Sequence, residues 1–431
     1  MTRGGCAAAV AVCLAGGATA PGCGGGEDGT GSPTHEGEAG LPIAARFGGN
    51  VPGVSASLGG AESAPFLIDT GSPVMLADTD DHDLADGWHV LDLELGDLHF
   101  SGLQVGAFDV FAGGEAGSAP FSGIIGGILL GDFALSFDAQ GGRVWLEDGP
   151  PAELPAELAA GAVGPAVEVD ARVAGGGRFM IAGEVRPVGA TRFLVRVAVE
   201  DQDDRAESFW ALVDSGATSV VLSNELMELL GDGGRPRLEG VVVDTASGPQ
   251  AGYLTRVWSL RLPGADDRVE QTSAPVMVLP DDDLFESVSA EVGQEVRGIV
   301  GGSFLRWYVA TLDYAAEAMR LLPYVSPDHI DPDEFVGLGF DLTRRSGAWV
   351  IEAVFGGTDA EAQDVRVGDT LVAIDGIAVA DLDESDIDGL ARSGGVGAVV
   401  AVALERAGED GRVEVDADVE VEDLLPAFDA P

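Results

Sequence analysis

Short apolar runs separated by Gly- and Asp-rich turns dominate the chain from about residue 41 onward. WHVLDLELGDLHF and RFLVRVAVE are typical of these runs. Short runs rich in Val, Leu and Ile and bounded by turn residues predict strands and hairpins, not long amphipathic helices. The pattern therefore predicts a mainly β protein.

An internal repeat organises the middle of the chain. FLIDTGSPVML at 66–76 matches ALVDSGATSVV at 211–221, and GIIGGILLGDFALSFD at 123–138 matches GIVGGSFLRWYVATLD at 298–313. Both pairs occur in the same order, with the glycines of the second pair in register. This arrangement indicates a duplication that produced two similar lobes.

The chain has 431 residues, a length that suits several domains. Pro-, Ala- and Gly-rich stretches mark the expected boundaries. We expect a signal peptide at 1–22, a flexible tether at 23–40, the first lobe at 41–148, an inter-lobe linker at 149–165, the second lobe at 166–324, a linker at 325–334, a C-terminal domain at 335–424 and a tail at 425–431.

The N-terminus resembles a bacterial lipoprotein signal. A short apolar stretch follows Arg3, and small residues lead into Cys23. The resemblance implies lipidation at Cys23, and the alternative is an ordinary secretory signal cleaved nearby. The Gly- and Glu-rich stretch that follows predicts a tether between a lipid anchor and a folded head. The expected location is therefore the cell envelope, with secretion as the other outcome.

The net charge and the positions of the cysteines limit which partners and ligands we expect for this protein. The formal net charge is −50, and all 23 basic residues are Arg. Such a field repels nucleic acid and anionic membranes, so we expect no nucleic-acid partner and membrane contact only through the lipid anchor. The three cysteines lie at or before Cys23 and the five His are scattered, so we predict no metal site and no cofactor. We expect a monomer.

The repeated Asp-Thr-Gly and Asp-Ser-Gly motifs resemble those of the pepsin and retropepsin superfamily of aspartic proteases. The resemblance covers about residues 41–324 and implies a bilobal acid-protease β-barrel fold. It also implies that Asp69 and Asp214 are the two catalytic residues. The alternative for either Asp alone is that it simply ends a strand and starts a turn.

The residue types suit this chemistry. Two carboxylates pressed together share a proton, so one can act as general base on a water while the other polarises the scissile carbonyl. Small glycines allow the sharp turn and the close approach of the opposite lobe. The resemblance implies supporting roles for Thr70, Gly71, Ser215, Gly216, Gly126 and Gly301.

The two lobes differ where a flap hairpin is expected. The interval from Asp69 to Gly126 is 30 residues shorter than that from Asp214 to Gly301. We therefore predict the flap on the second lobe, with at most a stub carrying Trp88 on the first. The predicted flap residues are Thr245, Ala246, Ser247, Gly248 and Tyr253. DTDDHD at 78–83 lacks the pattern of a cation-binding loop and predicts a solvated loop.

The C-terminal region resembles a PDZ domain over 335–424. FVGLGFDL and GDTLVAIDGIAV carry this resemblance, and the alternative is a Gly-rich β domain of another kind. The resemblance implies a β-barrel that binds the C-terminus of a peptide through its Gly-Leu-Gly-Phe loop. The implied peptide-binding residues are Gly337, Leu338, Gly339 and Phe340.

Together these features predict an envelope aspartic endopeptidase that acts on protein or peptide substrates. We expect the PDZ domain to dock peptide C-termini, or alternatively to bind a segment of its own chain as a lid or spacer. The rival hypothesis is a catalytically inactive lipoprotein that uses both folds as a peptide-binding adaptor. Intact Asp, Thr or Ser, and Gly positions in both motifs favour the enzyme.

Overall fold

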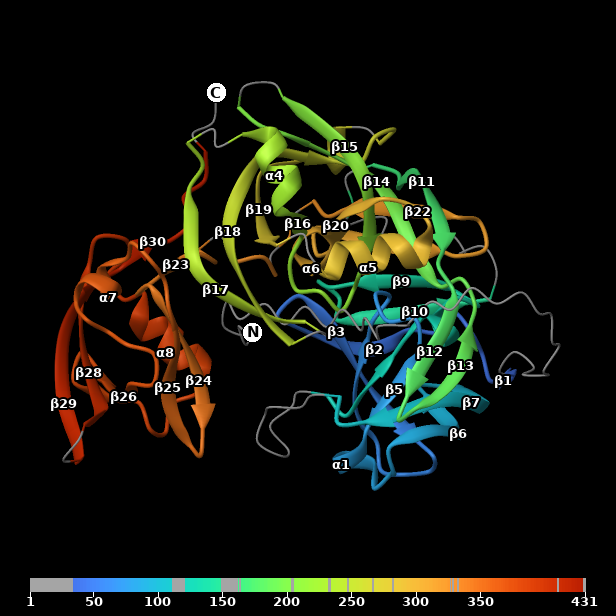
Figure 1. Cartoon of the computed structure of the whole chain (residues 1–431), viewed down its shortest axis with the longest axis horizontal. Helices are drawn as coiled ribbons and strands as arrows, with labels where there is room; N and C mark the ends of the chain where they lie inside the picture. Colours follow the sequence, from blue (N-terminus) through green and yellow to red (C-terminus); the bar gives the residue numbers. More distant parts are fainter. Residues whose placement is uncertain are drawn as a thin grey trace.

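The computed structural model describes most of the chain after residue 33. The described residues are 34–110, 121–148, 162, 164–202, 205–231, 234–245, 248–265, 267–280, 283–325, 327, 329–331, 333–408 and 411–428. Strands make up 54% and helices 12%, which confirms the predicted mainly β class. Figure 1 shows the first lobe in blue and cyan, the second in green to yellow, and the C-terminal domain in orange and red at one side.

The first lobe is built of short strands and two helical turns. In chain order they are β1 (Thr34–Glu36), β2 (Ile43–Gly48), β3 (Val51–Leu58), β4 (Ala64–Ile68), β5 (Met75–Asp78), α1 (Thr79–His82), β6 (Gly87–Leu95), β7 (Leu98–Phe108), β8 (Gly123–Ile125), α2 (Gly127–Leu130), β9 (Ala134–Asp138) and β10 (Arg143–Glu147). The solvated loop predicted at 78–83 is instead the helical turn α1, because Asp78 caps its N-terminus by accepting from the Asp80 N–H.

The second lobe repeats this order with additions. Its elements are β11 (Val167–Ala174), β12 (Gly177–Ile181), β13 (Glu184–Val188), β14 (Arg192–Glu200), β15 (Ala206–Val213), β16 (Val221–Ser223), α4 (Asn224–Leu230), β17 (Arg237–Thr245), β18 (Gly248–Arg261), η1 (Asp267–Val269), β19 (Gln271–Leu279), α5 (Asp283–Val292), β20 (Val296–Val300), α6 (Gly302–Leu305), β21 (Tyr308–Asp313) and β22 (Ala318–Pro323).

Strand pairing is the same in the centre of each lobe. β4 pairs parallel with β8, β8 antiparallel with β5, and β5 parallel with β7. β15, β20, β16 and β19 repeat these three pairings in the second lobe. The outer pairings of β3 with β4 and β6 recur as those of β14 with β15 and β18. The sequence repeat therefore corresponds to a repeat of topology.

One antiparallel sheet joins the lobes. Its strand order is β2, β10, β9, β21, β22 and β11. Ser136 of β9 faces its repeat equivalent Thr311 of β21, and their hydroxyls hydrogen-bond at 2.8 Å. The pseudo-two-fold axis of the molecule passes between these two residues.

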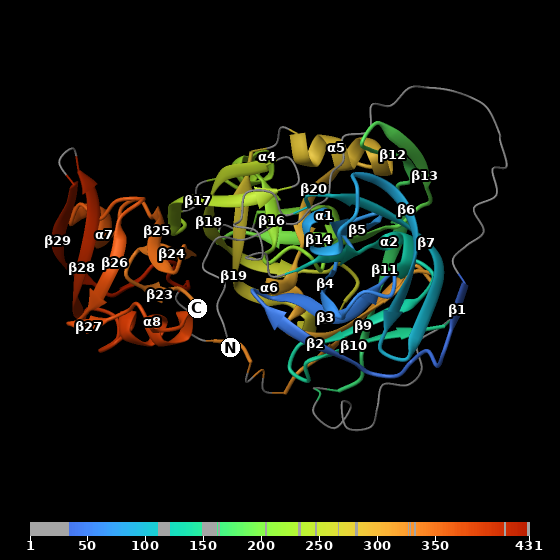
Figure 2. The ribbon, with the colours of Figure 1, turned by 90° about the horizontal axis from the view of Figure 1, so that it is seen from below.

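Besides the short turn η1, the β12–β13 hairpin, β17 and α5 of the second lobe have no equivalent in the first. β17 and α5 fall in the interval that is longer by 30 residues. The hairpin packs on the first lobe instead of its own, with Phe179, Ile181 and Val188 buried against Leu67 and Leu76. Figures 1 and 2 show it beside β6 and β7.

The C-terminal domain is a small β structure with two helices. Its elements are β23 (Val336–Gly337), β24 (Phe340–Arg345), β25 (Ala348–Val354), α7 (Asp359–Ala362), β26 (Thr370–Ile374), β27 (Ile377–Ala378), α8 (Glu384–Ala391), β28 (Val399–Gly408), β29 (Gly411–Glu420) and β30 (Glu422–Asp423). Its main sheet runs in the order β24, β25, β26, β28 and β29, and Ile351, Ile374 and Val419 lie in its core.

This domain packs directly on the second lobe. Phe355 and Leu425 belong to the same buried cluster as Val241 and Val243 of β17. The Gly356 N–H donates to the carbonyl of Glu239 at 3.1 Å. Apolar side chains and a backbone hydrogen bond therefore hold the domain beside β17, in addition to the predicted linker at 325–334.

Two segments at the ends of the predicted domains contact the folded lobes where the structure describes them. Within the predicted flexible tether, β1 pairs antiparallel with β7. At the start of the predicted tail, Leu425 is fully buried and its carbonyl accepts from Arg256 Nε at 2.8 Å. A flexible tether is therefore the wrong expectation for residues 34–36, because polar composition does not reveal a sheet edge elsewhere in the fold.

Candidate active site

Each predicted catalytic aspartate follows a buried strand. Asp69 comes after β4 and Asp214 after β15, and both are fully buried. The Asp69 N–H donates to the Ile125 carbonyl and the Asp214 N–H to that of Val300, both at 3.0 Å. The neighbouring strands β8 and β20 therefore fix both backbones in the same way.

Backbone donors hold one oxygen of each carboxyl group. Asp69 Oδ1 accepts from the N–H groups of Gly71 at 2.8 Å and Ser72 at 3.0 Å. Asp214 Oδ1 accepts from Gly216 at 2.8 Å and Ala217 at 3.1 Å. Among the described residues, no donor reaches the Oδ2 atom of either carboxyl. The two carboxyls lie close enough to affect each other's protonation, and carboxyls in such a position favour a single shared proton.

The glycines of the motifs bring the lobes together. A Cβ on Gly71 would lie 2.2 Å from Asp214 Cγ, and one on Gly216 would lie 2.6 Å from Asp69 Cγ. Each carboxyl group therefore occupies the space that a side chain on the opposite glycine would fill.

The hydroxyl residues of the motifs form a reciprocal network across the two-fold axis. Thr70 Oγ1 donates to the Val213 carbonyl at 2.9 Å and accepts from the Ser215 N–H at 3.0 Å. Ser215 Oγ donates to the Ile68 carbonyl at 2.7 Å and accepts from the Thr70 N–H at 3.1 Å. Four buried hydrogen bonds thus lock the two aspartate loops in register.

Gly126 and Gly301 support these loops. A Cβ on Gly126 would lie 2.1 Å from the Val74 carbonyl oxygen, and one on Gly301 would lie 2.1 Å from that of Ser219. No larger residue fits at either position without moving the loop that carries the aspartate.

Burial is the main influence on the two carboxyls. It raises the pKa of Asp69 well above its ordinary value, and the neighbouring Asp214 raises it further. Burial also raises the pKa of Asp214, while neighbouring Asp69 and the hydrogen bonds from the N–H groups of Gly216 and Ala217 oppose the rise. The positive charge of Arg192 lowers the pKa of both. The pair therefore behaves as one titrating unit that shares a proton.

β17 and β18 pair as a hairpin over the segment where the flap is predicted, with Thr245 paired to Gly248 next to the turn. Ala246 and Ser247 lie outside the described residues. Tyr253 lies farther along β18, with the Arg237 guanidinium 3.7 Å above its ring. On the first lobe, Trp88 lies near the start of β6, and its Nε1 donates to the Glu184 carbonyl of the β12–β13 hairpin at 3.1 Å.

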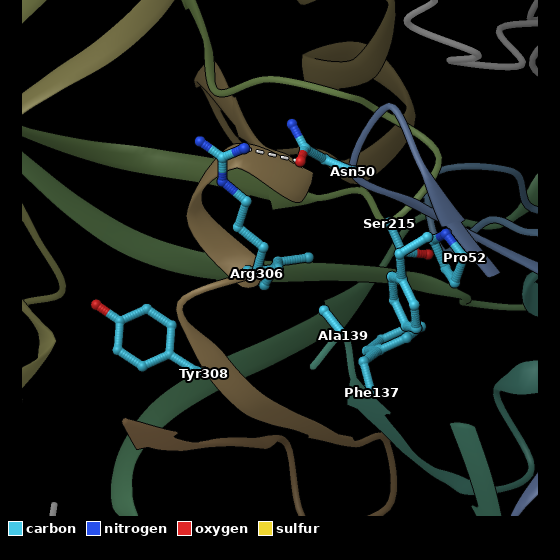
Figure 3. Close-up of a pocket in the computed structure, with 9 residues that line it drawn as sticks. Asn50, Pro52, Phe137, Ala139, Ser215, Arg306 and Tyr308 are labelled. Atoms are coloured by element: carbon cyan, nitrogen blue, oxygen red, sulfur yellow. Dashed lines mark hydrogen bonds between the residues drawn. The ribbon is translucent and has the colours of Figure 1, made fainter. Parts of the chain in front are cut away.

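A small cavity adjoins Ser215. Its lining includes Asn50, Pro52, Phe137, Ala139 and Arg306, and Figure 3 shows Asn50 accepting a hydrogen bond from Arg306. Tyr314 occupies the repeat position equivalent to Ala139, and its ring packs against Phe193 with centroids 5.2 Å apart. One side of the two-fold axis is thus filled by an aromatic ring, and the other is left hollow.

In the C-terminal domain, the predicted loop adjoins the edge of the main sheet. Gly337 lies in β23, Leu338 is buried in the core, and Phe340 begins β24, the first strand in the sheet order. Gly339 has a φ of +79°, and a Cβ there would lie 2.6 Å from that of Thr358. Only glycine suits this position.

Comparison with known proteins finds a family match within the second lobe. Residues 195–304 match the aspartyl protease family. The matched segment includes Asp214, Ser215, Gly216 and Gly301, and with the paired carboxyls it supports protease activity. Among solved structures, the chain is similar to an aspartic proteinase from Irpex lacteus, with 13% identity, a TM-score of 0.42, and coverage of 66% of this chain and 97% of that one. No curated protein matches.

Two residues near the dyad carry no sequence motif. Arg192 begins β14 and Tyr314 follows β21, and both are buried. The repeat positions equivalent to them hold Val51 and Ala139, so a search for repeated residues passes over them. The difference between the two lobes at these positions is the signal that could have identified Arg192 and Tyr314 in the sequence.

The structure also bears on metal and membrane chemistry. The described ranges contain no group of three or more His, Cys, Asp or Glu placed to hold a metal ion. Within the same ranges, no helix is both long and apolar enough to cross a bilayer. Cys23 and the predicted signal peptide lie outside the described residues.

Proposed function

We propose that this protein is an aspartic endopeptidase in which Asp69 and Asp214 activate a water against a peptide carbonyl. The observation that carries the proposal is the pair of buried carboxyls, each packed against the motif glycine of the opposite lobe and held by matched networks from both lobes. Shared-proton carboxyls separate the roles of acid and base between two like groups.

The chemistry follows from the position of the proton. The ionised carboxyl takes a proton from water while the water oxygen bonds to the carbonyl carbon. The protonated carboxyl gives its proton to the carbonyl oxygen, which produces a neutral tetrahedral diol. When the diol collapses and the C–N bond breaks, the leaving nitrogen takes a proton from the first carboxyl, and a diol hydroxyl returns its proton to the second. Protons balance over the cycle, and no cofactor is required.

Variants of the two aspartates test this proposal. Asp69→Asn and Asp214→Asn should each abolish cleavage of a fluorogenic peptide, and a statine-type inhibitor should block the parent protein. Asp170→Asn, at an exposed position of β11, is the matched control and should keep full activity. Retained cleavage in Asp214→Asn would overturn the dyad. A parent protein that binds peptides but never cleaves them would favour the inactive-adaptor alternative.

We further propose that the C-terminal domain is a PDZ domain that docks peptide C-termini. The loop from Gly337 to Phe340 and the edge position of β24 support this role, because an extended peptide can add to such an edge. A labelled peptide with a free C-terminal carboxylate should bind at least about tenfold more tightly than its amidated form. Equal binding of the two would mean that the loop does not read a carboxylate.

Anchoring through Cys23 remains our proposal for the location of the protein in the cell envelope. Cys23→Ser should move the protein from the membrane fraction to the soluble fraction. A variant that still sediments with membranes would contradict the lipoprotein assignment. Protein or peptide substrates and a monomeric state belong to the same proposal.

A further inference from the structure

The chain that leads into β14 lies near the dyad, at Thr191 and Arg192. Thr191 Cβ lies 2.5 Å from where a Cβ on Gly127 would be. The Gly127 N–H donates to the Ser72 carbonyl at 2.7 Å, and the Ser72 N–H donates to Asp69 Oδ1. A continuous set of contacts therefore leads from the Asp69 carboxyl to Thr191, and Arg192 is the next residue.

Arg192 forms a buried ion pair with α5. Its side chain is 0% exposed, and its Nε and Nη2 donate to the two carboxylate oxygens of Glu291, each at 2.8 Å. Glu291 keeps 23% of its side chain exposed. Within the described part of the chain, Arg192 Nη1 has no partner.

The first lobe shows that the fold itself does not require an arginine here. Leu67 and Leu212 are equivalent, and they pair with Gly53 and Leu194. The equivalent of Arg192 is therefore Val51, a small apolar residue in the same kind of site. Burying a charged group costs several kcal/mol before its partner offsets the cost, so packing alone does not explain this choice.

The electrostatic surroundings of the dyad contain few groups. The charge of Arg192 lowers the pKa of both carboxyls against the effect of burial. Tyr314 faces the same region with its pKa raised, chiefly by burial, and remains neutral. Glu291 on α5 is the counter-charge of Arg192. Asp69, Asp214, Arg192, Glu291 and Tyr314 are thus the titratable groups to consider.

We propose that Arg192 is a positioning residue of the dyad: held by Glu291, it stabilises the singly protonated pair and so sets the pH range in which the pair can act as acid and base. This inference rests on the proposed protease function. Without the positive charge, the negative dyad would take up its second proton at a higher pH. Without Glu291, no negative charge would offset that of Arg192, so the dyad would take up its second proton at a lower pH.

Activity profiles give the first test. The pH dependence of kcat/KM should be measured for the parent protein, Arg192→Gln, Glu291→Gln and the double variant. In Arg192→Gln, the acidic and the basic limb of the pH profile of kcat/KM should both move to higher pH by about one unit. A shift of one unit is a tenfold change in proton affinity. In Glu291→Gln, both limbs of the profile should move to lower pH. The limbs of the double variant should lie between those of the two single variants. Arg196→Gln, on the same strand with an exposed side chain, should move neither limb. Loss of kcat with both limbs unmoved would overturn the proposal.

A stability measurement separates failure of this inference from failure of the protease assignment. The free energy of unfolding should be followed from pH 4 to pH 7 with and without Arg192→Gln, in the parent and in the Asp69→Asn, Asp214→Asn background. Arg192→Gln should steepen the loss of stability with rising pH more where the two aspartates are present than where they are absent, because Glu291 loses its partner in both backgrounds. An equal change of slope in the two backgrounds would overturn the inference, even in a protein that cleaves nothing. Should Arg192→Gln fail to fold, Glu291→Gln supplies the same test with the opposite sign, because its side chain is partly solvated.

Discussion

In the first lobe, Leu67 and Leu76 lie beneath a hairpin that belongs to the second lobe. In the second lobe, their equivalents Leu212 and Val221 lie beneath that lobe's own α5 and β17. The inner strands pair identically in both lobes, so the difference is confined to what covers them. Duplication has therefore kept the residues that meet at the two-fold axis in both lobes. The elements that cover the outer face of the inner strands differ, and those of the first lobe come from the second.

This comparison also explains why the lobes depend on each other. Ile181 of the hairpin lies so close to Gly106 of β7 that a Cβ on the glycine would be 2.0 Å from Ile181 Cδ1. The first lobe, taken alone, would expose an apolar face that includes Leu67, Leu76 and Ile124. Exposed faces of this kind are costly in water, so we expect the lobes to fold as one unit.

The largest expected effect comes from the glycines at the axis, where the lobes are most alike. Gly71→Ala would place a methyl group on the Asp214 carboxyl and should reduce kcat/KM by at least about 100-fold, because displacing a catalytic group by about 1 Å costs that much. Gly216→Ala should act in the same way through Asp69. Gly177→Ala, where no atom lies within 4 Å of the new Cβ, is the control. Full activity in Gly71→Ala would mean that the lobes do not approach as described.

The next effect concerns the covers, where the lobes differ most. Ile181→Ala should reduce the free energy of unfolding by about 2–5 kcal/mol, the usual cost of such a truncation in a packed core. Leu284→Ala in α5 should cost a similar amount, because it covers the equivalent face of the second lobe. Met180→Ala, exposed on the same hairpin, should change stability by less than about 0.5 kcal/mol in a urea titration. Equal losses for Ile181→Ala and Met180→Ala would show that the hairpin does not cover the first lobe.

The same contrast separates what the sequence could predict from what it could not. Asp69 and Asp214 stood out because each motif is local and repeated, and the shorter first lobe was visible by counting residues. The pairing of β1 with β7 and the burial of Leu425 depend on contacts far along the chain, so local composition revealed neither. Arg192 was overlooked because its equivalent is Val51, and the comparison of motifs selects only residues that both lobes share.

A pH effect should reveal the raised pKa of both aspartates. A carboxyl whose pKa is raised in the folded state binds more protons there than in the unfolded chain, so stability falls as the pH rises above about 3.9 toward the folded value. Asp69→Asn reduces this loss and should be more stable than the parent protein at neutral pH, with the gap closing in acid. Asp214→Asn should change stability in the same direction, because burial raises the pKa of both carboxyls. Thermal unfolding across pH measures both, and a variant that is less stable at neutral pH than in acid would contradict the assignment.

The smallest expected effect comes from the aromatic ring that fills only one side of the axis. Tyr314 is buried, and among the described residues its hydroxyl has no hydrogen-bond partner. Removing a buried hydroxyl that lacks a partner relieves its desolvation cost, so Tyr314→Phe should raise the free energy of unfolding by up to about 1 kcal/mol. Tyr308 is the matched control, because it is also buried but its hydroxyl hydrogen-bonds Gln271. Tyr308→Phe should therefore lose about 1 kcal/mol under the same conditions. Opposite signs would establish that the ring of Tyr314 contributes only its packing, whereas equal losses would show that its hydroxyl has a partner on the side of the dyad.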